Sequence, residues 1–259
     1  MCFLKGAKMK IKLLILISAI SLAGCSAGND LSYSKTAYKK TDMDFVGIPT
    51  ILGLGTIGTR FPVTPHYSLT AKHVAKFSFD SVISYHPTCD VALVKSDNTS
   101  KELPVLSSTG VGVSVVNYGY SFISALPVES SGYTDRYIKL ENANNNLACP
   151  AILSTAGVRK GMSGGPVYNK TTKSIVGVNV SYTDSLSVKN DKGSVKTEKF
   201  SGSMFIPFQN FKAWLVSEIN KTEDKGLLKI NNEYNFYDND SGDNEKDALK
   251  NADYLKNKM

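Results

Sequence analysis

Short apolar runs recur along the middle of the chain, and each is broken by glycine, proline, asparagine or serine. Between Phe45 and Pro207 the runs are "PTILGLGTIGTRF", "FDSVISYH", "DVALV", "GVSVVNYGYSF", "YIKL", "ACPAIL" and "SIVGVNVSY". Valine, isoleucine, tyrosine and phenylalanine are frequent in them, as is typical of strands. No helical period separates the runs, so the pattern predicts an all-β domain, an antiparallel sandwich or barrel.

A helical period occurs late in this region, at residues 208 to 220. In "FQNFKAWLVSEIN" the apolar side chains recur at helical spacing, at Phe208, Phe211, Leu215 and Ile219. Side chains at this spacing lie on one face of an α-helix. The pattern predicts one C-terminal helix with an apolar stripe.

Two polar segments flank the apolar region. Residues 26 to 44, "SAGNDLSYSKTAYKKTDMD", lack apolar periodicity and predict a tether before the folded domain. Residues 221 to 259 are rich in lysine, acids and asparagine, which predicts a solvated tail with at most a helical turn near "EKDALKNADYLKNK". We assign no chemistry to this tail.

The N-terminal residues have the organisation of an export signal. Lys8, Lys10 and Lys12 precede the apolar run "LLILISAISLAG", which ends directly before Cys25. A membrane-spanning helix needs about 20 apolar residues, so this shorter run predicts a signal peptide at residues 1 to 24. The ending "LAGC" resembles the bacterial lipobox, which implies cleavage and lipidation at Cys25, with residues 25 to 44 as the tether. Ser26 then points to the outer membrane of the cell envelope; an ordinary secretory signal with a chance cysteine is the alternative.

Composition and charge narrow the functional classes. The 259 residues are 42% hydrophobic and 20% charged, as in a soluble globular protein of one or two domains. The net charge of +7 includes four lysines at positions 5, 8, 10 and 12. Subtracting them from the 30 basic residues leaves 26 against 23 acidic ones, a net charge of +3. This excess is too weak and scattered to indicate nucleic-acid binding.

The histidines and cysteines suggest no metal site, because the three histidines are scattered and show no ligand spacing with cysteine. Cys2 lies in the signal and Cys25 is the lipidation candidate, which leaves Cys89 and Cys149. In an oxidising periplasm these two cysteines are candidates for one disulfide. Two buried free thiols are the alternative.

The segment "GMSGGPVYN" holds the candidate nucleophile, Ser163. Residues 161 to 165 match G-x-S-x-G, the nucleophile elbow of α/β-hydrolases. That fold needs a catalytic histidine after the serine, whereas His66, His73 and His86 all precede it. Chain order therefore excludes the esterase interpretation, and the missing βαβ pattern agrees with this exclusion. His66 and His86, each beside a proline, are interpreted as loop residues.

The order histidine, aspartate, serine is present instead. His73 lies in "SLTAKHVA", Asp90 opens "DVALV", and Ser163 lies in "GMSGGP". With "GLGT" before them and "IVGVNV" after them, these motifs resemble the trypsin-like serine peptidases, in particular the bacterial V8-like and HtrA-type enzymes. The resemblance covers residues 45 to 220, roughly two thirds of the chain.

The resemblance implies a fold and an activity. The fold is two antiparallel six-stranded-type β-barrels of chymotrypsin-like form, over about 45–106 and 107–207, with a C-terminal helix at 208–220. The activity is that of a serine endopeptidase that needs no cofactor and acts on protein or peptide substrates. The second hypothesis, from another functional class, is a catalytically vestigial binding or adhesion lipoprotein on the same scaffold.

The resemblance also implies a role for each motif residue. Ser163 attacks the peptide carbonyl, and His73 takes its proton and passes it to the leaving amine. Asp90 holds the imidazole in the required tautomer. The backbone N–H groups of Gly161 and Ser163 form the oxyanion hole for the carbonyl oxygen as it becomes negative.

The sequence departs from the family pattern at two points, which affect the expected first barrel and the expected oxyanion hole. Only 17 positions separate His73 from Asp90, which predicts either a trimmed first barrel or a different acid, with Asp80 and Asp97 as rivals. Met162 stands where many animal relatives carry an aspartate that pairs with a freed N-terminus, and methionine cannot form that ion pair. We therefore hypothesise an oxyanion hole that forms without proteolytic activation.

The family pattern also locates a substrate pocket. Its floor falls on Gly157, and its walls fall on Asn179, Val180 and Ser181, with residues 203 to 205 as further candidates. The absence of an acid at Gly157 disfavours a preference for arginine or lysine. Asn179 stands where V8-like relatives carry a histidine for acidic side chains, so the family pattern does not support that preference either. Arg159 and Lys160 flank the site, where they either favour acidic substrates or are solvated loop charges.

Overall fold

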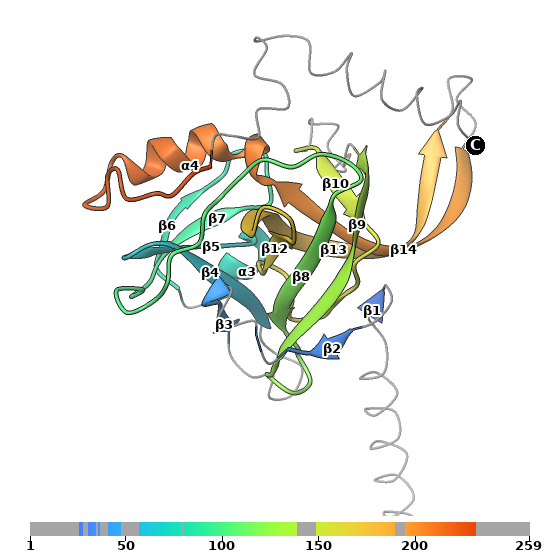
Figure 1. Ribbon diagram of the computed structural model, residues 1–259, viewed down its shortest axis with the longest axis horizontal. Coiled ribbons are helices and arrows are strands. Elements are labelled where there is room, and N and C mark those ends of the chain that lie inside the picture. Colours follow the sequence, from blue (N-terminus) through green and yellow to red (C-terminus); the bar gives the residue numbers. More distant parts are fainter. Residues whose placement is uncertain are drawn as a thin grey trace, which may run out of the picture.

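The computed structural model describes residues 26–27, 31–34, 36, 41–47, 57–78, 80–138, 149–189 and 195–231. The predicted signal peptide at residues 1–24, the lipidation candidate Cys25 and residues 232–259 of the predicted tail lie outside these ranges. Most of the described chain is strand, and the strands form two main antiparallel sheets that lie beside each other (Figure 1). The prediction of an all-β fold with a short C-terminal helix is confirmed.

The first sheet, which we call the first barrel, has five strands in the order β3-β4-β5-β7-β6. This is one strand fewer than the expected six, and within the described chain its outer strands β3 and β6 do not pair with each other. They are β3 (Asp44–Gly47), β4 (Ile57–Thr64), β5 (Tyr67–Thr70), β6 (Val82–Tyr85) and β7 (Ala92–Lys95). β5 is buried along its whole length, whereas β6 alternates between half-buried and exposed side chains, as an edge strand does. One strand, β6, therefore lies between His73 and Asp90 in the described chain, which accommodates their short separation.

The second sheet closes on itself into a barrel. Six strands pair in the order β10-β14-β13-β12-β8-β9, and β9 pairs again with β10. They are β8 (Ser114–Tyr120), β9 (Pro127–Ile138), β10 (Ala151–Ser154), β12 (Pro166–Asn169), β13 (Ser174–Lys189) and β14 (Val195–Pro207). Closure gives each strand of the ring a partner on both sides, which protects the barrel from edge-to-edge association.

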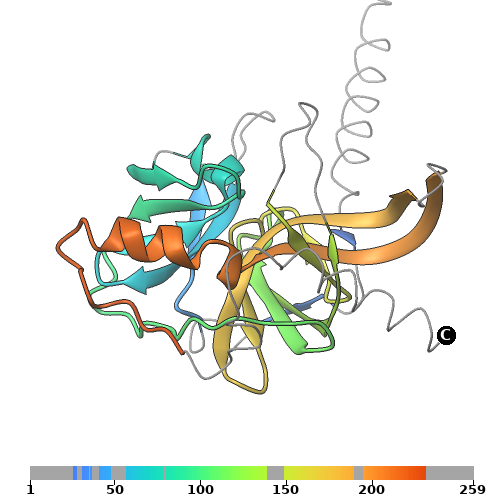
Figure 2. The same cartoon turned by 90° about the horizontal axis from the view of Figure 1, so that it is seen from above.

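Strands β13 and β14 form a hairpin that extends beyond the barrel (Figures 1 and 2). They pair from Gly177 opposite Pro207 to Lys189 opposite Val195. The sequence predicted only the apolar part of β13, "SIVGVNVSY". The outer part was missed because its residues are mostly polar and lack the apolar alternation that indicates a half-buried strand.

The expected tether is partly built into the fold. β1 (Ser26–Ala27) pairs with β11 (Val158–Arg159), and β2 (Ser32–Tyr33) pairs with β9. Met43, just before β3, is only 1% exposed. Backbone pairing needs no apolar side chains, so the polar composition of residues 26 to 44 did not reveal these contacts.

A continuous hydrophobic core joins the two sheets to the C-terminal helix, and it includes Phe61 of β4 and Tyr118 of β8. The predicted helix is divided into a 3-10 turn, η1 (Phe208–Asn210), and an α-helix, α4 (Lys212–Ile219). The predicted apolar stripe is no more than 2% exposed at each of its positions, Phe208, Phe211, Leu215 and Ile219. No helix within the described ranges has the length and apolar character needed to cross a membrane.

Cys89 and Cys149 form a disulfide with an S–S distance of 2.08 Å, so the alternative of two free thiols does not hold. Cys89 lies directly before Asp90, and Cys149 lies just before β10. The bond therefore ties the turn that carries Asp90 to the six-stranded barrel. Closing a loop of 60 residues stabilises the folded state by about 4 kcal/mol in the chain-entropy account.

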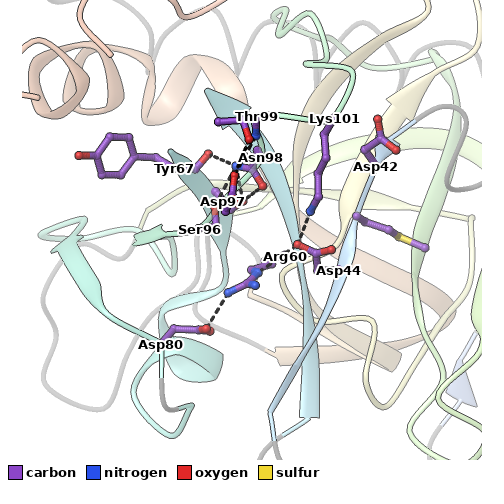
Figure 3. A network of polar contacts seen from close by, with 12 residues as sticks. Asp42, Asp44, Arg60, Tyr67, Asp80, Ser96, Asp97, Asn98, Thr99 and Lys101 are labelled. Atoms are coloured by element: carbon purple, nitrogen blue, oxygen red, sulfur yellow. Dashed lines mark hydrogen bonds and ion pairs between the residues drawn. The ribbon is translucent and has the colours of Figure 1, made fainter. Parts of the chain in front are cut away.

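A polar network holds the outer side of the first sheet (Figure 3). Arg60 of β4 pairs with Asp44 at 3.3 Å and with Asp80 at 2.7 Å, and Lys101 pairs with Asp44 as well. Asn98 is buried and donates two hydrogen bonds of 3.0 Å to the carbonyls at either end of the β4–β5 turn. The network fixes this turn and commits the Asp80 carboxylate to Arg60.

After α4 the chain turns back onto the first sheet through residues 221–231, which we call the C-terminal hook. Asp224, 1% exposed, accepts hydrogen bonds from His66 in the β4–β5 turn. Glu223 accepts a hydrogen bond of 2.9 Å from the Tyr67 hydroxyl. The expectation of a solvated tail is therefore wrong for Asp224, which is buried, and the exposed Glu223 also has a partner in the first sheet. Lys221, Lys225 and Lys229 are exposed, as expected.

The segment between the two barrels is bonded on both sides. On one side, Leu106 donates to the Lys229 carbonyl at 2.9 Å and accepts from the Asn231 N–H at 2.8 Å. On the other side, Ser107 donates to the Ile175 carbonyl at 2.9 Å. The connection is thus held between the C-terminal hook and β13.

Candidate active site

His73 lies on α3 (Lys72–Ala75), a short helix that directly follows β5. Its neighbours Val74 and Ala75 are 1% and 2% exposed, so the core anchors the helix on their side. The His73 side chain is left 45% exposed. The buried strand β5 thus leads into a short helix with one buried and one exposed face, and the imidazole lies on the exposed face.

Asp90 binds His73 at two points. The His73 backbone N–H donates to Oδ1 at 2.9 Å, and Nδ1 lies 2.6 Å from Oδ2. Burial alone would raise the pKa of Asp90, but the hydrogen bonds from His73 and the nearby Lys72 lower it. The carboxylate is therefore ionised, which places the imidazole proton on Nδ1 and leaves Nε2 as an acceptor.

The rival acids are bound elsewhere. Asp80 pairs with Arg60, as described above, and Asp97 accepts hydrogen bonds from the backbone and the hydroxyl of Thr99 at 3.1 and 2.7 Å. Asp90 is the acid that contacts His73.

The Ser163 turn is held against the first barrel by Thr59 of β4. The Thr59 N–H donates to the Ser163 carbonyl at 2.8 Å, and its hydroxyl donates to the Gly161 carbonyl at 2.9 Å. Gly164 has a φ of +84°, and a Cβ there would lie 2.2 Å from the Thr59 carbonyl and the Thr70 hydroxyl. Glycine is required at 164 both for this backbone conformation and for this close approach.

Two bonded carbonyls, those of Lys160 and Met162, fix the orientation of the N–H groups of Gly161 and Ser163. The Lys160 carbonyl accepts from the Phe122 N–H at 2.9 Å, and the Met162 carbonyl accepts from the Gly165 N–H at 3.0 Å. In a trans peptide the C=O and the N–H point in opposite directions. The N–H groups of Gly161 and Ser163 therefore point away from these partners, and neither has an acceptor among the residues that the structure describes.

His73 and Ser163 line one cleft of about 410 Å³ between the two barrels. Gly161 and residues 179–181 line it as well, so the structure brings together most of the predicted site residues. Within the described chain, the two side chains share this cleft without a direct hydrogen bond to each other. Contacts of this kind are often long before substrate binds.

Gly157 is not one of the residues that line the cleft, and its neighbour Val158 is. Gly157 is buried, and its N–H donates to the Ser130 hydroxyl at 2.8 Å. The structure therefore gives Gly157 no place in the wall of this cleft, and its role as a pocket floor stays a prediction.

His86 has a positioning role that the sequence did not reveal. Its ring accepts the N–H of Cys89 at 2.8 Å and lies edge-on to Trp214, with ring centroids 5.2 Å apart. Burial and the charge of Lys72 lower the pKa of His86, which favours the neutral ring that this hydrogen bond needs. His86 therefore shapes the turn that leads into Asp90. Within the described ranges, no group of three or more histidine, cysteine or acidic side chains could hold a metal ion.

Comparison with known proteins adds a structural result. No protein-family model matches the sequence, and no curated protein matches it. Among solved structures, the HtrA-type protease AlgW with a tripeptide matches with a TM-score of 0.51 at 16% identity, over 71% of this chain and 62% of AlgW. The active form of the Rv3671c protease from M. tuberculosis matches with a TM-score of 0.51 at 18% identity, over 76% of this chain and 92% of that one. The chain has the fold of the HtrA-type, trypsin-like serine proteases.

The structural likeness to these proteases covers only part of AlgW and does not distinguish an active from an inactive form. The chain spans less than two thirds of the length of AlgW. The inactive form of the Rv3671c protease also matches with a TM-score of 0.51, at 17% identity and over 72% of this chain and 96% of that one. Because the active and inactive forms match equally well, the comparison gives the serine protease fold, and the chemistry has to be argued from the site.

Proposed function

We propose that this protein is a serine endopeptidase in which Ser163 is the nucleophile, His73 the general base and Asp90 its carboxylate partner. The observation that carries the proposal is the double contact of Asp90 with the backbone and ring of His73, at the wall of the cleft that Ser163 also lines. The serine protease fold supports the same function, because it is the scaffold on which this set of residues acts.

In the proposed reaction, Ser163 Oγ attacks the peptide carbonyl while His73 Nε2 accepts the hydroxyl proton. Asp90 holds the imidazole in the Nδ1–H tautomer and stabilises the imidazolium that forms. His73 then gives the proton to the leaving amine, which frees the first product and leaves an ester on Ser163. Water attacks this ester by the same sequence of proton transfers and releases the second product.

The oxyanion hole follows from the backbone geometry of the Ser163 turn. The N–H groups of Gly161 and Ser163 have no acceptor within the described chain, so both can donate to the carbonyl oxygen as it becomes negative. One donor of this kind typically contributes about 10²- to 10³-fold in rate. In this proposal the hole needs no proteolytic activation, since Met162 is fully buried beside Val128 and Val158 and anchors the turn without an ion pair. Activity that appears only after trimming of the chain would contradict this.

A serine-directed probe tests the nucleophile. We expect a fluorophosphonate to label the parent protein and to leave Ser163→Ala unlabelled, because the probe needs an activated hydroxyl. Ser100→Ala removes an exposed serine away from the cleft and serves as the matched control, which should label like the parent. Failure of the parent to label, with intact folding by circular dichroism, would favour the vestigial binding lipoprotein.

We also propose that the protein is exported and anchored by lipid at Cys25, on the outer membrane of a bacterial cell envelope. The basic, apolar and "LAGC" segments of residues 1–25 support this proposal. Metabolic labelling with an alkyne fatty acid should mark the parent and not Cys25→Ala. Equal labelling of both proteins would exclude Cys25 as the attachment site.

A further inference from the structure

The cleft beside Ser163 carries an excess of positive charge. Arg159 and Lys160 both line it, together with His73. The other lining residues within the described chain are apolar or neutral, and none is aspartate or glutamate. Ile57, Val158 and other apolar side chains form part of the wall and limit the water that could screen these charges.

Arg159 is half-buried at the wall, and its guanidinium is incompletely paired. Its Nε is buried from solvent and has no hydrogen-bond partner within the described chain. The Arg159 carbonyl accepts the Met162 N–H at 3.0 Å, so the backbone that carries this side chain is fixed. A buried donor without an acceptor costs free energy, and a ligand that supplies the acceptor recovers it.

Lys160 is exposed at the rim of the same cleft, and an aromatic ring steadies its ammonium. Lys160 Nζ lies 4.5 Å from the centre of the Phe122 ring. The Lys160 carbonyl also accepts the Phe122 N–H, so backbone and side chain are held by the same partner. A cation over a ring face keeps its opposite side free for an anion.

We infer that the cleft selects substrates with an acidic side chain next to the scissile bond, with Arg159 and Lys160 as the specificity-determining residues; this rests on the proposed peptidase function. A substrate carboxylate in the cleft pairs with the half-buried Arg159 guanidinium in a charge-assisted hydrogen bond and gives this group an acceptor that it lacks within the described chain. Lys160 at the rim adds a second attraction. Of the two roles that the sequence left open for these cations, the structure favours contact with substrate over solvated loop charge.

The selectivity is tested with a peptide series in which glutamate or glutamine occupies each position from four residues before to two residues after the cleaved bond. At a position directly next to the cleaved bond we expect the glutamate peptide to be cleaved with a kcat/KM about tenfold higher than the glutamine peptide, because charge-assisted hydrogen bonds are stronger than neutral ones. Added salt should reduce this ratio. A ratio near one at both positions next to the cleaved bond, or a preference for glutamine there, would overturn the inference.

Variants assign the preference to the two cations. Arg159→Gln should lower the glutamate-to-glutamine ratio about tenfold, and Lys160→Gln should lower it about twofold to fivefold, since an exposed pair contributes less. Lys170→Gln, which removes an exposed cation at the β12–β13 turn, is the matched control and should leave the ratio unchanged. An unchanged ratio in both Arg159→Gln and Lys160→Gln would overturn the assignment.

Binding separates failure of this inference from failure of the peptidase function. Fluorescence anisotropy with Ser163→Ala needs no turnover, and it should show about tenfold tighter binding of the glutamate peptide than of the glutamine peptide. Labelling of the parent by the fluorophosphonate without any glutamate preference leaves the peptidase and overturns the inference. Glutamate-selective binding without labelling supports the cationic cleft and overturns the peptidase.

Discussion

Two regions of the first barrel hold a histidine in nearly the same way. Asp90 accepts the backbone N–H and faces Nδ1 of His73 at 2.9 and 2.6 Å. Asp224 does the same for His66, at 2.8 and 2.7 Å. Each pair therefore fixes the position and the tautomer of its ring, and the contact between acid and imidazole does not by itself distinguish a catalytic pair from a structural one.

The pairs differ in what surrounds them. The Asp90 side chain is 34% exposed and its histidine faces the cleft with Ser163, whereas the Asp224 side chain is 2% exposed and joins the C-terminal hook to the β4–β5 turn. The first pair has a candidate nucleophile nearby, together with two N–H groups that have no acceptor among the described residues. The second pair has two elements of the fold to hold together. The surroundings of the imidazole thus decide which pair can do chemistry.

Removal of each acid should produce the largest contrast. Asp90→Asn should lower kcat/KM by about 10⁴-fold, because the amide favours the wrong tautomer of His73. Asp224→Asn should change kcat/KM less than about threefold and should lower the free energy of unfolding instead, since it weakens a buried contact. Kinetics on one peptide and urea unfolding of both variants measure this. Comparable losses of activity in the two variants would contradict the division of roles.

Two glycines with positive φ sharpen the same contrast. A Cβ at Gly164 would meet backbone and side-chain atoms at 2.2 Å, whereas a Cβ at Gly226 in the C-terminal hook, with a φ of +82°, would meet nothing within 4 Å. Gly226→Ala should therefore cost about 1 kcal/mol of unfolding free energy for its backbone conformation alone. Gly164→Ala should cost about 3 kcal/mol or more and should reduce probe labelling of Ser163. Equal costs in urea unfolding would show that the Ser163 turn relaxes more easily than the structure indicates.

The smallest effect concerns pH. The hydrogen bond to Asp224 raises the pKa of His66, and the charges of Asp224, Glu223 and Asp97 add to this, against the opposing effect of burial. The folded pKa then exceeds the unfolded value of about 6.5, so this stabilisation is complete below that pH and is lost as the pH rises through the folded pKa. His66→Gln should therefore flatten the fall in unfolding free energy that begins as the pH rises above about 6.5. A slope that stays the same in His66→Gln would assign the pH dependence to another group.

The sequence predicted those features of the fold and the site that depend on residues close together in the chain. The order of His73, Asp90 and Ser163, each inside a short motif, predicted the serine protease fold before any contact was known. The apolar stripe of the C-terminal helix could also be predicted, because its apolar residues recur every three or four positions along the chain. These features depend on residues close in the chain, which a pattern can record.

The second histidine pair could not be predicted from a pattern. Asp224 lies 158 positions from His66, in a segment whose composition indicates solvent exposure. A carboxylate becomes buried there because a distant histidine supplies its hydrogen bonds, and no periodicity encodes such a partner. The positioning role of His86 was missed for the same reason, since its acceptor function depends on how the turn at Cys89 folds back.

The connection at Leu106 and Ser107 has a consequence for how the molecule moves. Because β13 bonds it from one side and the C-terminal hook from the other, it lacks the loose backbone that a hinge requires. Opening and closing of one lobe against the other would have to break these bonds first. If the protein has the proposed peptidase function, its substrate should therefore dock into a rigid groove, with adjustment confined to side chains and loop tips.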